Sequence, residues 1–155
     1  MGIEFNLYEL IKKGGIINNI CGNDVMSVYK DISNKISCPS YIDHQELYFE
    51  LCSRETMIST AIGNGFSIPH PTHPLIKKAS DQQVTLCYLE NEIEMSAFDG
   101  KPVSVMFVIL TENQNEHLAI LQTLAKNLQN NDFKELLKRK PTLGEIEAFI
   151  TGTNA

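Results

Sequence analysis

The sequence lacks the features that mark several large classes of protein. No stretch approaches the roughly 18 consecutive apolar residues of a membrane span. The N-terminal residues M-G-I-E-F-N-L-Y contain neither a basic segment nor a long apolar run, so we expect no signal peptide. The G-x-x-x-x-G-K-S/T loop of nucleotide-binding proteins and the G-x-S-x-G elbow of serine hydrolases are also missing. We therefore expect a cytoplasmic protein without direct membrane insertion.

Basic residues are too few for a nucleic-acid-binding face. The chain has 13 Lys and Arg against 19 Asp and Glu, which gives a net charge of −6. Because contacts to nucleic-acid phosphates require a basic face, we expect no nucleic-acid partner. An acidic surface instead favours docking onto a basic protein surface.

Closely spaced cysteine pairs of the C-x-x-C type are absent as well. The chain contains four cysteines, at Cys21, Cys38, Cys52 and Cys87. Without paired spacing, they are expected to be small buried hydrophobic residues in a reducing compartment.

The residues that are present favour one α/β domain over residues 1–155. Of the 155 residues, 43% are hydrophobic and 21% are charged, which favours a folded core over disorder. Val103–Leu110 is the most apolar run and is expected to be the central strand, buried on both faces. Further strands are predicted at Ile16–Ile20, 66–68 and 84–89. Strands interspersed with helices predict a layered α/β fold.

Helices are predicted where a capping residue precedes apolar side chains at helical spacing. Capping boxes are expected at Asn6 with Glu9, Asp43 with Glu46, Asp132 with Glu135, and Thr142 with Glu145. Asp24 is expected to cap another helix. One further helix, capped by Asn115 or a neighbour, is expected to carry Leu118, Leu121, Leu124, Ala125 and Leu128 at helical spacing.

Two turns are predicted before the central strand. The first is expected at Asn91-Glu92, with Ile93 and Met95 forming a separate edge strand after it. The second is expected at Asp99-Gly100, which is a common turn dipeptide.

The most informative stretch is 54–70, which reads R-E-T-M-I-S-T-A-I-G-N-G-F-S-I-P-H. The two glycines and the asparagine of Gly63-Asn64-Gly65 tolerate positive φ and predict a tight turn. Pro69 keeps Ile68 extended and stiffens the approach to His70. A rigid platform of this kind suits a reactive histidine. An ordinary turn followed by a surface histidine remains open from the residue types alone.

This stretch resembles the signature of the enzyme IIA domains of the bacterial phosphotransferase system, of the fructose–mannitol and nitrogen-regulatory type. The shared pattern is R-E-x-x-x-S-T-x-I-G-N-G-x-x-I-P-H, and the segments on either side also fit in order and spacing. The resemblance implies a mixed sheet flanked by helices. It also implies that His70 is the phosphorylated residue, with the phosphoryl group on Nε2. The donor would be the histidine-containing phosphocarrier protein, and the acceptor an enzyme IIB domain or a regulatory target protein.

Transfer to a histidine needs a neutral imidazole and hydrogen-bond donors for the phosphoryl oxygens. Arg54 offers a planar fork that binds two such oxygens, although an arginine at a helix end also commonly binds the last carbonyls. With cations and backbone amides available, we expect no metal and no cofactor. Further phosphate contacts are expected from residues of the turn region, namely Ser59, Thr60, Gly63, Asn64 and Gly65. Ser59 and Thr60 would alternatively satisfy the turn's own backbone.

His117 is the second candidate histidine. It is predicted in the first turn of the helix after the central strand, where α/β folds bind anions. Positive charge is disfavoured at that helix end, so a neutral N–H donor is expected. The alternative is a half-buried histidine without a chemical role. The E-H-L-A-I-L segment is similar to the family's segment around a second active-site histidine.

His73 and His44 complete the histidines. His73 in H-P-T-H departs from the pattern expected after the phosphorylated histidine and either borders a docking surface or, with His70 and His117, binds zinc. His44 is expected to be solvated in the first turn of a helix.

Three functions therefore compete. The leading one is a phosphoryl carrier that serves sugar uptake. The second is a regulatory module whose phosphorylation state controls binding to other proteins, and the third is a metal-dependent hydrolase. The sequence names no sugar and fixes no oligomeric state.

Overall fold

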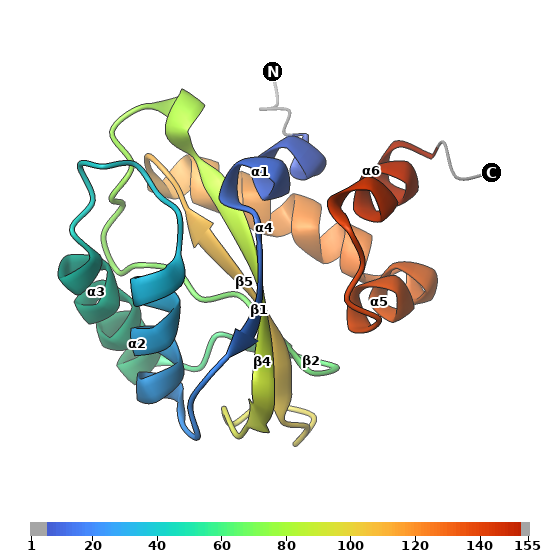
Figure 1. Ribbon diagram of the computed structural model, residues 1–155, viewed down its shortest axis with the longest axis horizontal. Helices are drawn as coiled ribbons and strands as arrows, with labels where there is room; N and C mark the ends of the chain where they lie inside the picture. Colours follow the sequence, from blue (N-terminus) through green and yellow to red (C-terminus); the bar gives the residue numbers. More distant parts are fainter. Residues whose placement is uncertain (1–5, 153–155) are drawn as a thin grey trace.

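The computed structural model describes residues 6–152, which form a mixed sheet with helices on both faces (Figure 1). The strands are β1 (Ile16–Ile20), β2 (Ala61–Gly63), β3 (Phe66–Ser67), β4 (Gln83–Ile93) and β5 (Val103–Leu110). The helices are α1 (Leu7–Gly14), α2 (Val25–Lys35), α3 (His44–Met57), α4 (Gln114–Leu128), α5 (Asn131–Lys138) and α6 (Leu143–Thr151), with a short 3-10 helix η1 (Ala79–Asp81). The predicted α/β fold is confirmed.

The sheet is ordered β1-β4-β5-β3-β2, so β5 is the central strand, as predicted. β5 pairs antiparallel with β4 on one side and parallel with β3 on the other. Seven of the eight residues of β5 are buried, the exception being Ser104. A strand with helices on both faces needs an apolar side chain at almost every position, which explains the uninterrupted apolar run.

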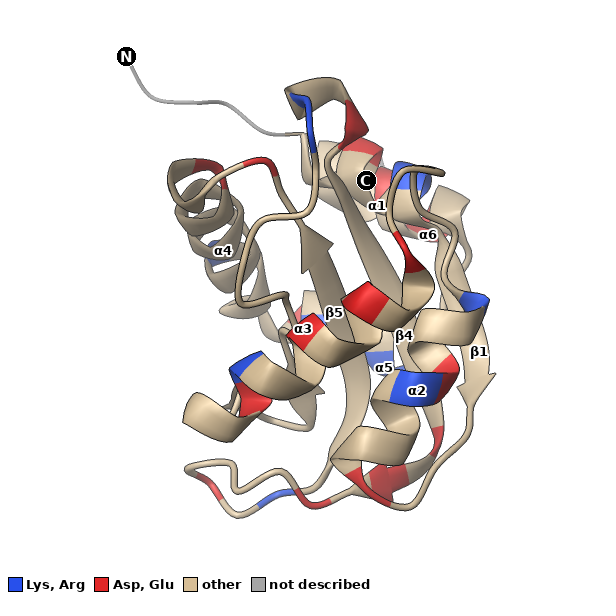
Figure 2. Ribbon diagram, turned by 90° about the vertical axis from the view of Figure 1, so that its left-hand side faces the viewer, with Lys and Arg blue, Asp and Glu red and all other residues tan. Residues whose placement is uncertain are grey.

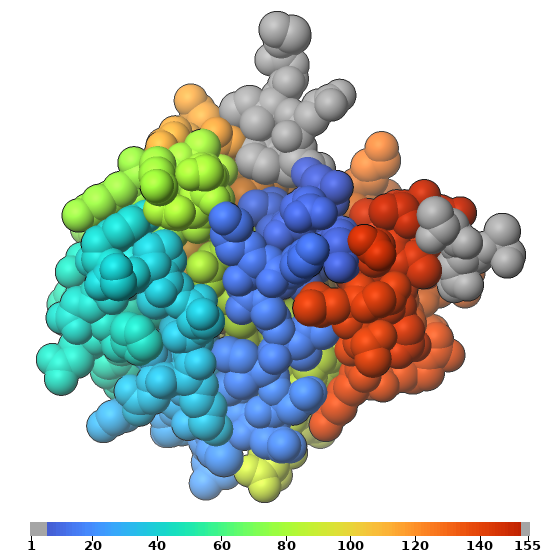
Figure 3. Space-filling model, turned by 45° about the horizontal axis from the view of Figure 1, so that its top comes forward, coloured from blue at the N-terminus to red at the C-terminus, as the bar shows by residue number. Residues whose placement is uncertain are grey.

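Two apolar cores lie on the two faces of the sheet. α2 and α3 cover one face, whereas α1, α4, α5 and α6 cover the other (Figure 1). Alternate residues of β5 serve the two cores, with Phe107 and Ile109 on the α4 side and Met106 and Val108 on the α3 side. α1, in dark blue in Figure 3, lies against α6, in red. The two cores fix the end of β5 relative to α3 and α4, where the candidate site lies.

The turn predicted at Asn91-Glu92 is wrong, because β4 continues through these residues to Ile93. The register between β4 and β5 shifts between Tyr88 and Ile93, and the polar residues Glu90 to Glu92 are exposed in this outer part of the strand. Their solvated side chains give a turn-like composition to an extended segment. The separate edge strand at Ile93 and Met95 is therefore also wrong. The turn at Asp99-Gly100 is confirmed, with the Gly100 amide donating to Ala97 O at 3.0 Å.

Asn6 and Asp43 cap α1 and α3 as predicted, but neither forms the reciprocal capping box that was expected. α4 is capped by Asn113, two positions before Asn115. Reciprocal capping boxes are present at Asp24 and at Thr142, the latter as predicted. α5 begins earlier than predicted because Asn130, not Asp132, accepts from the first amides of the helix. The apolar side of α4 also differs from the predicted set. Leu118 is 55% exposed, and the buried residues are Ile120, Leu124 and Leu128.

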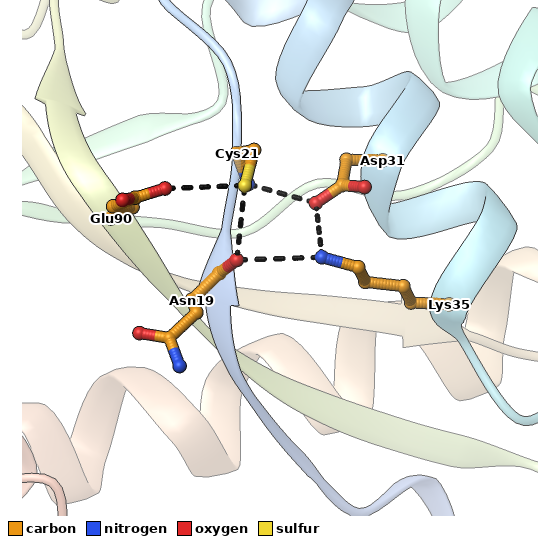
Figure 4. A network of polar contacts seen from close by, with 5 residues as sticks. All are labelled: Asn19, Cys21, Asp31, Lys35 and Glu90. Atoms are coloured by element: carbon orange, nitrogen blue, oxygen red, sulfur yellow. Dashed lines mark hydrogen bonds and ion pairs between the residues drawn. The ribbon is translucent and has the colours of Figure 1, made fainter.

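The prediction of four buried cysteines is wrong for Cys21. All four thiols are free, as expected, but only Cys87 is fully buried, and Cys21 is exposed. Cys21 directly follows β1, and polar contacts connect it to α2 and β4 (Figure 4). Its amide donates to Asp31 Oδ2 at 2.8 Å, and its Sγ donates to Glu90 Oε2 at 3.2 Å. Lys35 Nζ lies 2.8 Å from the same Asp31 oxygen. The bond to Glu90 raises the pKa of the Cys21 thiol.

The surface charges agree with the sequence composition. On the side that carries α2 and α3, Lys and Arg positions are interspersed with Asp and Glu positions (Figure 2). Within residues 6–152, no helix combines the length and apolar character needed to cross a bilayer.

Candidate functional site

His70 follows a tight hairpin at the edge of the sheet. β2 and β3 pair antiparallel around the predicted turn, where Asn64 has φ 59° and Gly65 has φ 87°. β3 then pairs with the middle of β5, and Ile109 N donates to Pro69 O at 2.9 Å. The residue before His70 is therefore attached to the central strand. This fixes the backbone of His70 at the end of β3, as the sequence predicts.

The ring of His70 is oriented by a backbone carbonyl. Nδ1 lies 2.8 Å from Ile68 O, and since a carbonyl oxygen only accepts, Nδ1 carries the proton. The neutral ring then has its lone pair on Nε2. Burial lowers the pKa of His70, the nearby Arg54 guanidinium lowers it further, and the bond to Ile68 acts in the opposite direction. The ring is therefore neutral at pH 7.

His117 faces His70 from the first turn of α4. The ring centroids are 4.1 Å apart and the ring planes are inclined by 44°. Asn113 caps the helix, with Glu116 N donating to its Oδ1 at 2.8 Å. Burial, together with the proximity of His70 and Arg54, lowers the pKa of His117 to about 4. The structure thus brings together two neutral imidazoles that lie 47 positions apart in the chain (117 − 70).

The low pKa of His117 predicts acid-sensitive stability. In the unfolded chain this histidine titrates near about 6.5, whereas in the folded protein its pKa is about 4. The unfolded state therefore binds more protons between these values, so the free energy of unfolding should fall as the pH drops from 7 towards 4. Urea unfolding at several pH values measures this slope. The slope should be shallower in His117→Gln and unchanged in a control, His44→Gln, and an equal slope in His117→Gln would contradict the low pKa.

A cavity of about 190 Å³ lies beside the two histidines. It is lined by Arg54, Met57, His70, Pro71, Thr72, Pro74, Ile109, Thr111, Gln114 and His117. Arg54 comes from the last turn of α3, and its Nη1 donates to Ile58 O at 2.8 Å. The helix-end contact considered for this arginine is therefore present, yet the guanidinium also lines the cavity. With the N-terminal turn of α4 on the other side, the cavity has donors suited to an anion.

The glycine turn does not line this cavity. Asn64 N donates to Asp99 Oδ2 at 2.8 Å, and Gly63 and Asn64 line a separate apolar groove beside α4. Ser59 Oγ donates to Met95 O, and both the amide and the hydroxyl of Thr60 donate to Glu55. Of the predicted phosphate contacts, the structure therefore brings Arg54 and His117 to His70 but leaves the turn region in contacts of its own.

His73 lies outside the cavity lining. It is held by Glu50 of α3, whose Oε1 accepts from His73 N at 2.6 Å and whose Oε2 lies 3.2 Å from Nδ1. His44 is exposed, with Nε2 3.8 Å from Cys38 Sγ. Residues 6–152 contain no group of three or more His, Cys, Asp and Glu side chains placed to hold a metal ion. The hypothesis of a metal-dependent hydrolase therefore has no ligand set in this part of the chain.

Sequence reasoning missed three residues at or behind the site. Thr111 and Gln114 line the cavity between β5 and α4. Their position at the end of the central strand and the start of a helix is the signal that would have indicated them. Glu55 lies behind the site and was passed over as the second letter of the R-E pair.

Comparison with known proteins identifies the family of this chain. The family model for the phosphoenolpyruvate-dependent sugar phosphotransferase system, EIIA 2, matches residues 9–152. The nitrogen regulatory protein of Pseudomonas aeruginosa is 29% identical over 148 residues, which cover 93% of this chain and 94% of that protein. The nitrogen regulatory protein of Escherichia coli is 31% identical over 111 residues, covering 70% of this chain and 67% of that protein.

Solved structures show the same fold. The nitrogen regulatory protein IIA-Ntr of Neisseria meningitidis superposes with a TM-score of 0.72 at 26% identity, over 92% of this chain and 97% of that one. Enzyme IIA-mannitol of Escherichia coli, solved in complex with phosphorylated enzyme IIB-mannitol, superposes with a TM-score of 0.65 at 14% identity, over 88% of this chain and 94% of that one. Because the family model spans almost the whole described chain, this protein belongs to the EIIA type 2 family of the phosphotransferase system.

Proposed function

We propose that this protein carries a phosphoryl group on Nε2 of His70. The observation that carries the proposal is the 2.8 Å bond between His70 Nδ1 and Ile68 O. It places the proton on Nδ1 and leaves the Nε2 lone pair free to attack phosphorus. The lowered pKa of His70 keeps that lone pair available at neutral pH.

The transfer step follows from the groups around the cavity. The P–N bond to the donor histidine breaks and its electron pair returns to the donor ring, whose other nitrogen holds a proton, as a new P–N bond forms at His70 Nε2. While Nδ1 keeps its proton, the phosphorylated His70 ring is positively charged, and the attached phosphoryl dianion compensates this charge. In the loose transition state the charge is spread over three phosphoryl oxygens, which need donors in fixed positions. Arg54, Gln114 at the start of α4 and His117 line the cavity beside His70 and carry N–H groups that can serve as these donors. Reversal of the same step passes the group to the acceptor.

The partners have to reach this cavity, and its rim is partly apolar. Met57 lines the cavity and is 64% exposed, and Leu118, next to His117, is 55% exposed. Exposed large apolar side chains beside a site suit transient protein contacts. We assign the histidine-containing phosphocarrier protein as donor and an enzyme IIB domain as acceptor. The complex of IIA-mannitol with phosphorylated IIB-mannitol supports the acceptor. Four free thiols fit a location in the reducing cytoplasm.

A regulatory role is the second candidate function. Two of the relatives, from Pseudomonas aeruginosa and Escherichia coli, are nitrogen regulatory proteins. In this role the charge of phospho-His70 controls binding to a regulatory target, and no sugar is transported. Transfer of label from the phosphorylated protein to enzyme IIB domains of the same organism supports transport. Capture of a non-IIB partner by only one phosphorylation state supports regulation.

The proposal is tested by reconstituting the phosphoenolpyruvate-driven relay. The purified protein is incubated with enzyme I and the phosphocarrier protein, and its intact mass is recorded at alkaline pH, where a phosphohistidine is stable. We expect uptake of one phosphoryl group, which acid should remove. No uptake from an active relay would refute the proposal.

His117 is predicted to assist transfer without being modified itself. His117→Ala should leave His70 phosphorylatable but slow transfer, because a donor to the phosphoryl oxygens is lost. Removal of one such donor costs on the order of 100-fold in rate. His117→Gln retains an N–H donor and should recover part of the loss. Quenched-flow experiments with labelled donor measure these rates. Phosphate on His117, or equal rates for the alanine variant and the wild type, contradicts this role.

A further inference from the structure

A chain of hydrogen bonds connects α2 to the backbone just before His70. Its central group is the carboxylate of Glu55, in the last turn of α3. Tyr29 OH, from α2, donates to Glu55 Oε1. The hydroxyl of Thr60 donates to the same oxygen at 2.8 Å, and the amide of Thr60 donates to Oε2 at 2.8 Å. One carboxylate therefore holds a helix and the residue that precedes β2.

The chain continues from Thr60 to the ring of His70. Thr60 O accepts from Ile68 N at 3.0 Å, and Ile68 O lies 2.8 Å from His70 Nδ1. The carbonyl that sets the tautomer of His70 thus belongs to a residue whose amide is held by Thr60, and Thr60 is held by Glu55. Two hydrogen bonds join Thr60 to Glu55, and one hydrogen bond forms each of the two later links, from Thr60 to Ile68 and from Ile68 to His70.

A carboxylate is the group that this arrangement requires. Tyr29 is fully buried and Thr60 is 4% exposed, so their three donors cannot turn to water. An unpaired buried donor is costly, and an ionised carboxylate is acceptor-only at both oxygens. A glutamine in the same place presents an NH₂ group to one of these donors. Both terminal atoms of the side chain at position 55 therefore have to accept hydrogen bonds.

From this geometry we infer that Glu55 is a positioning residue for His70: through Thr60 and Ile68 it holds the carbonyl that keeps the proton on Nδ1 and the lone pair on Nε2. The tautomer is a property of the unphosphorylated protein and is independent of the proposed function. The consequence for the transfer rate rests on that function. The charge of Glu55 also acts to raise the pKa of His70, against the lowering by burial and Arg54, which agrees with its proximity.

Arg54 and Glu55, the R-E pair of the sequence pattern, then have different roles. Arg54 and Glu55 are neighbours in the last turn of α3, but Arg54 lines the cavity whereas Glu55 binds the residues behind it. One helix end supplies the donor for the phosphoryl oxygens and also the acceptor that orients the nucleophile.

The first test reads the tautomer directly. Uniformly ¹⁵N-labelled protein is studied by long-range ¹H–¹⁵N NMR at pH 8, where the ring of His70 is neutral. The wild type should show a protonated Nδ1 and an unprotonated Nε2. In Glu55→Gln we expect both nitrogens to move to intermediate shifts, because the second tautomer becomes populated. Glu46→Gln, the same change in the first turn of α3, is the matched control and should retain the wild-type shifts.

The second test separates positioning from stability. In the phosphate relay, Glu55→Gln should lower the initial rate of phosphorylation by about 10- to 100-fold, as for small misplacements of a reacting group. Val28→Ala removes buried contacts on α2 without touching the hydrogen-bond chain, and should lower the melting temperature while leaving both the tautomer and the rate unchanged.

The tautomer of His70 in the variants decides whether Glu55 is a positioning residue. A single Nδ1–H tautomer in folded Glu55→Gln overturns it, whatever the rate. If Glu55→Gln does not fold, Tyr29→Phe removes one of the three donors and should shift the His70 nitrogens in the same direction by less, and an unshifted spectrum overturns the inference instead. If the wild type takes up no phosphate, the proposed function fails while the tautomer measurement still stands.

Discussion

Replacing His70 with alanine is expected to abolish phosphate uptake from the relay. The imidazole Nε2 is the nucleophile in the proposed transfer, and among the residues that line the cavity only His117 offers another ring-nitrogen lone pair. His117 is the nearest alternative, but its ring belongs to a different element and approaches from the side of α4. The loss should appear as an unchanged intact mass after incubation times that fully phosphorylate the wild type.

His73→Ala is the control for this experiment. His73 lies three positions after His70, yet it is bound to Glu50 and lies outside the cavity lining. Its removal should leave the extent of phosphorylation unchanged. Phosphate uptake by His70→Ala at the normal rate would show that the nucleophile has been assigned to the wrong residue.

Arg54→Lys is expected to fold normally and to transfer phosphate slowly. The variant keeps the positive charge but loses the planar fork. In the structure one arm of that fork already binds Ile58 O at 2.8 Å, so a lysine Nζ has to serve either the carbonyl or the phosphoryl oxygens. Loss of one transition-state donor costs about 10²- to 10³-fold in rate. Single-turnover transfer by quenched flow measures the loss, and thermal unfolding checks the fold.

Arg139→Lys is a matched control for the same chemical change. Arg139 is exposed at the end of α5, outside the cavity lining. It should transfer phosphate at the wild-type rate. Wild-type rates in Arg54→Lys as well would remove Arg54 from the mechanism.

The sequence predicted those elements whose signals are local. The apolar run of β5 reveals a strand with both faces buried, and the capping residues Asp24 and Thr142 start helices where expected. The Asn64-Gly65 turn follows from residue types that tolerate positive φ. Composition failed in β4, where Asn91 and Glu92 look like a turn but lie in an exposed extension of a strand. Such a residue pair does not distinguish a solvated strand from a loop.

The site was predictable only in part, because its contacts join distant segments. His70, His117 and Arg54 were singled out from three separate parts of the sequence, and the fold places them around one cavity. The glycine turn was expected to bind phosphate. However, the Asn64 amide is occupied by Asp99, which lies 35 positions later. The role of Glu55 likewise depends on Tyr29 and Thr60, whose proximity no local pattern predicts.

The central claim is that the phosphoryl group resides on Nε2 of His70. Its most direct test is NMR of the ¹⁵N-labelled protein, phosphorylated by the relay and kept at alkaline pH, in which coupling to ³¹P identifies the modified ring nitrogen. We predict coupling at Nε2 of His70 and none at Nδ1. Coupling at His117, or at Nδ1 of His70, would contradict the account.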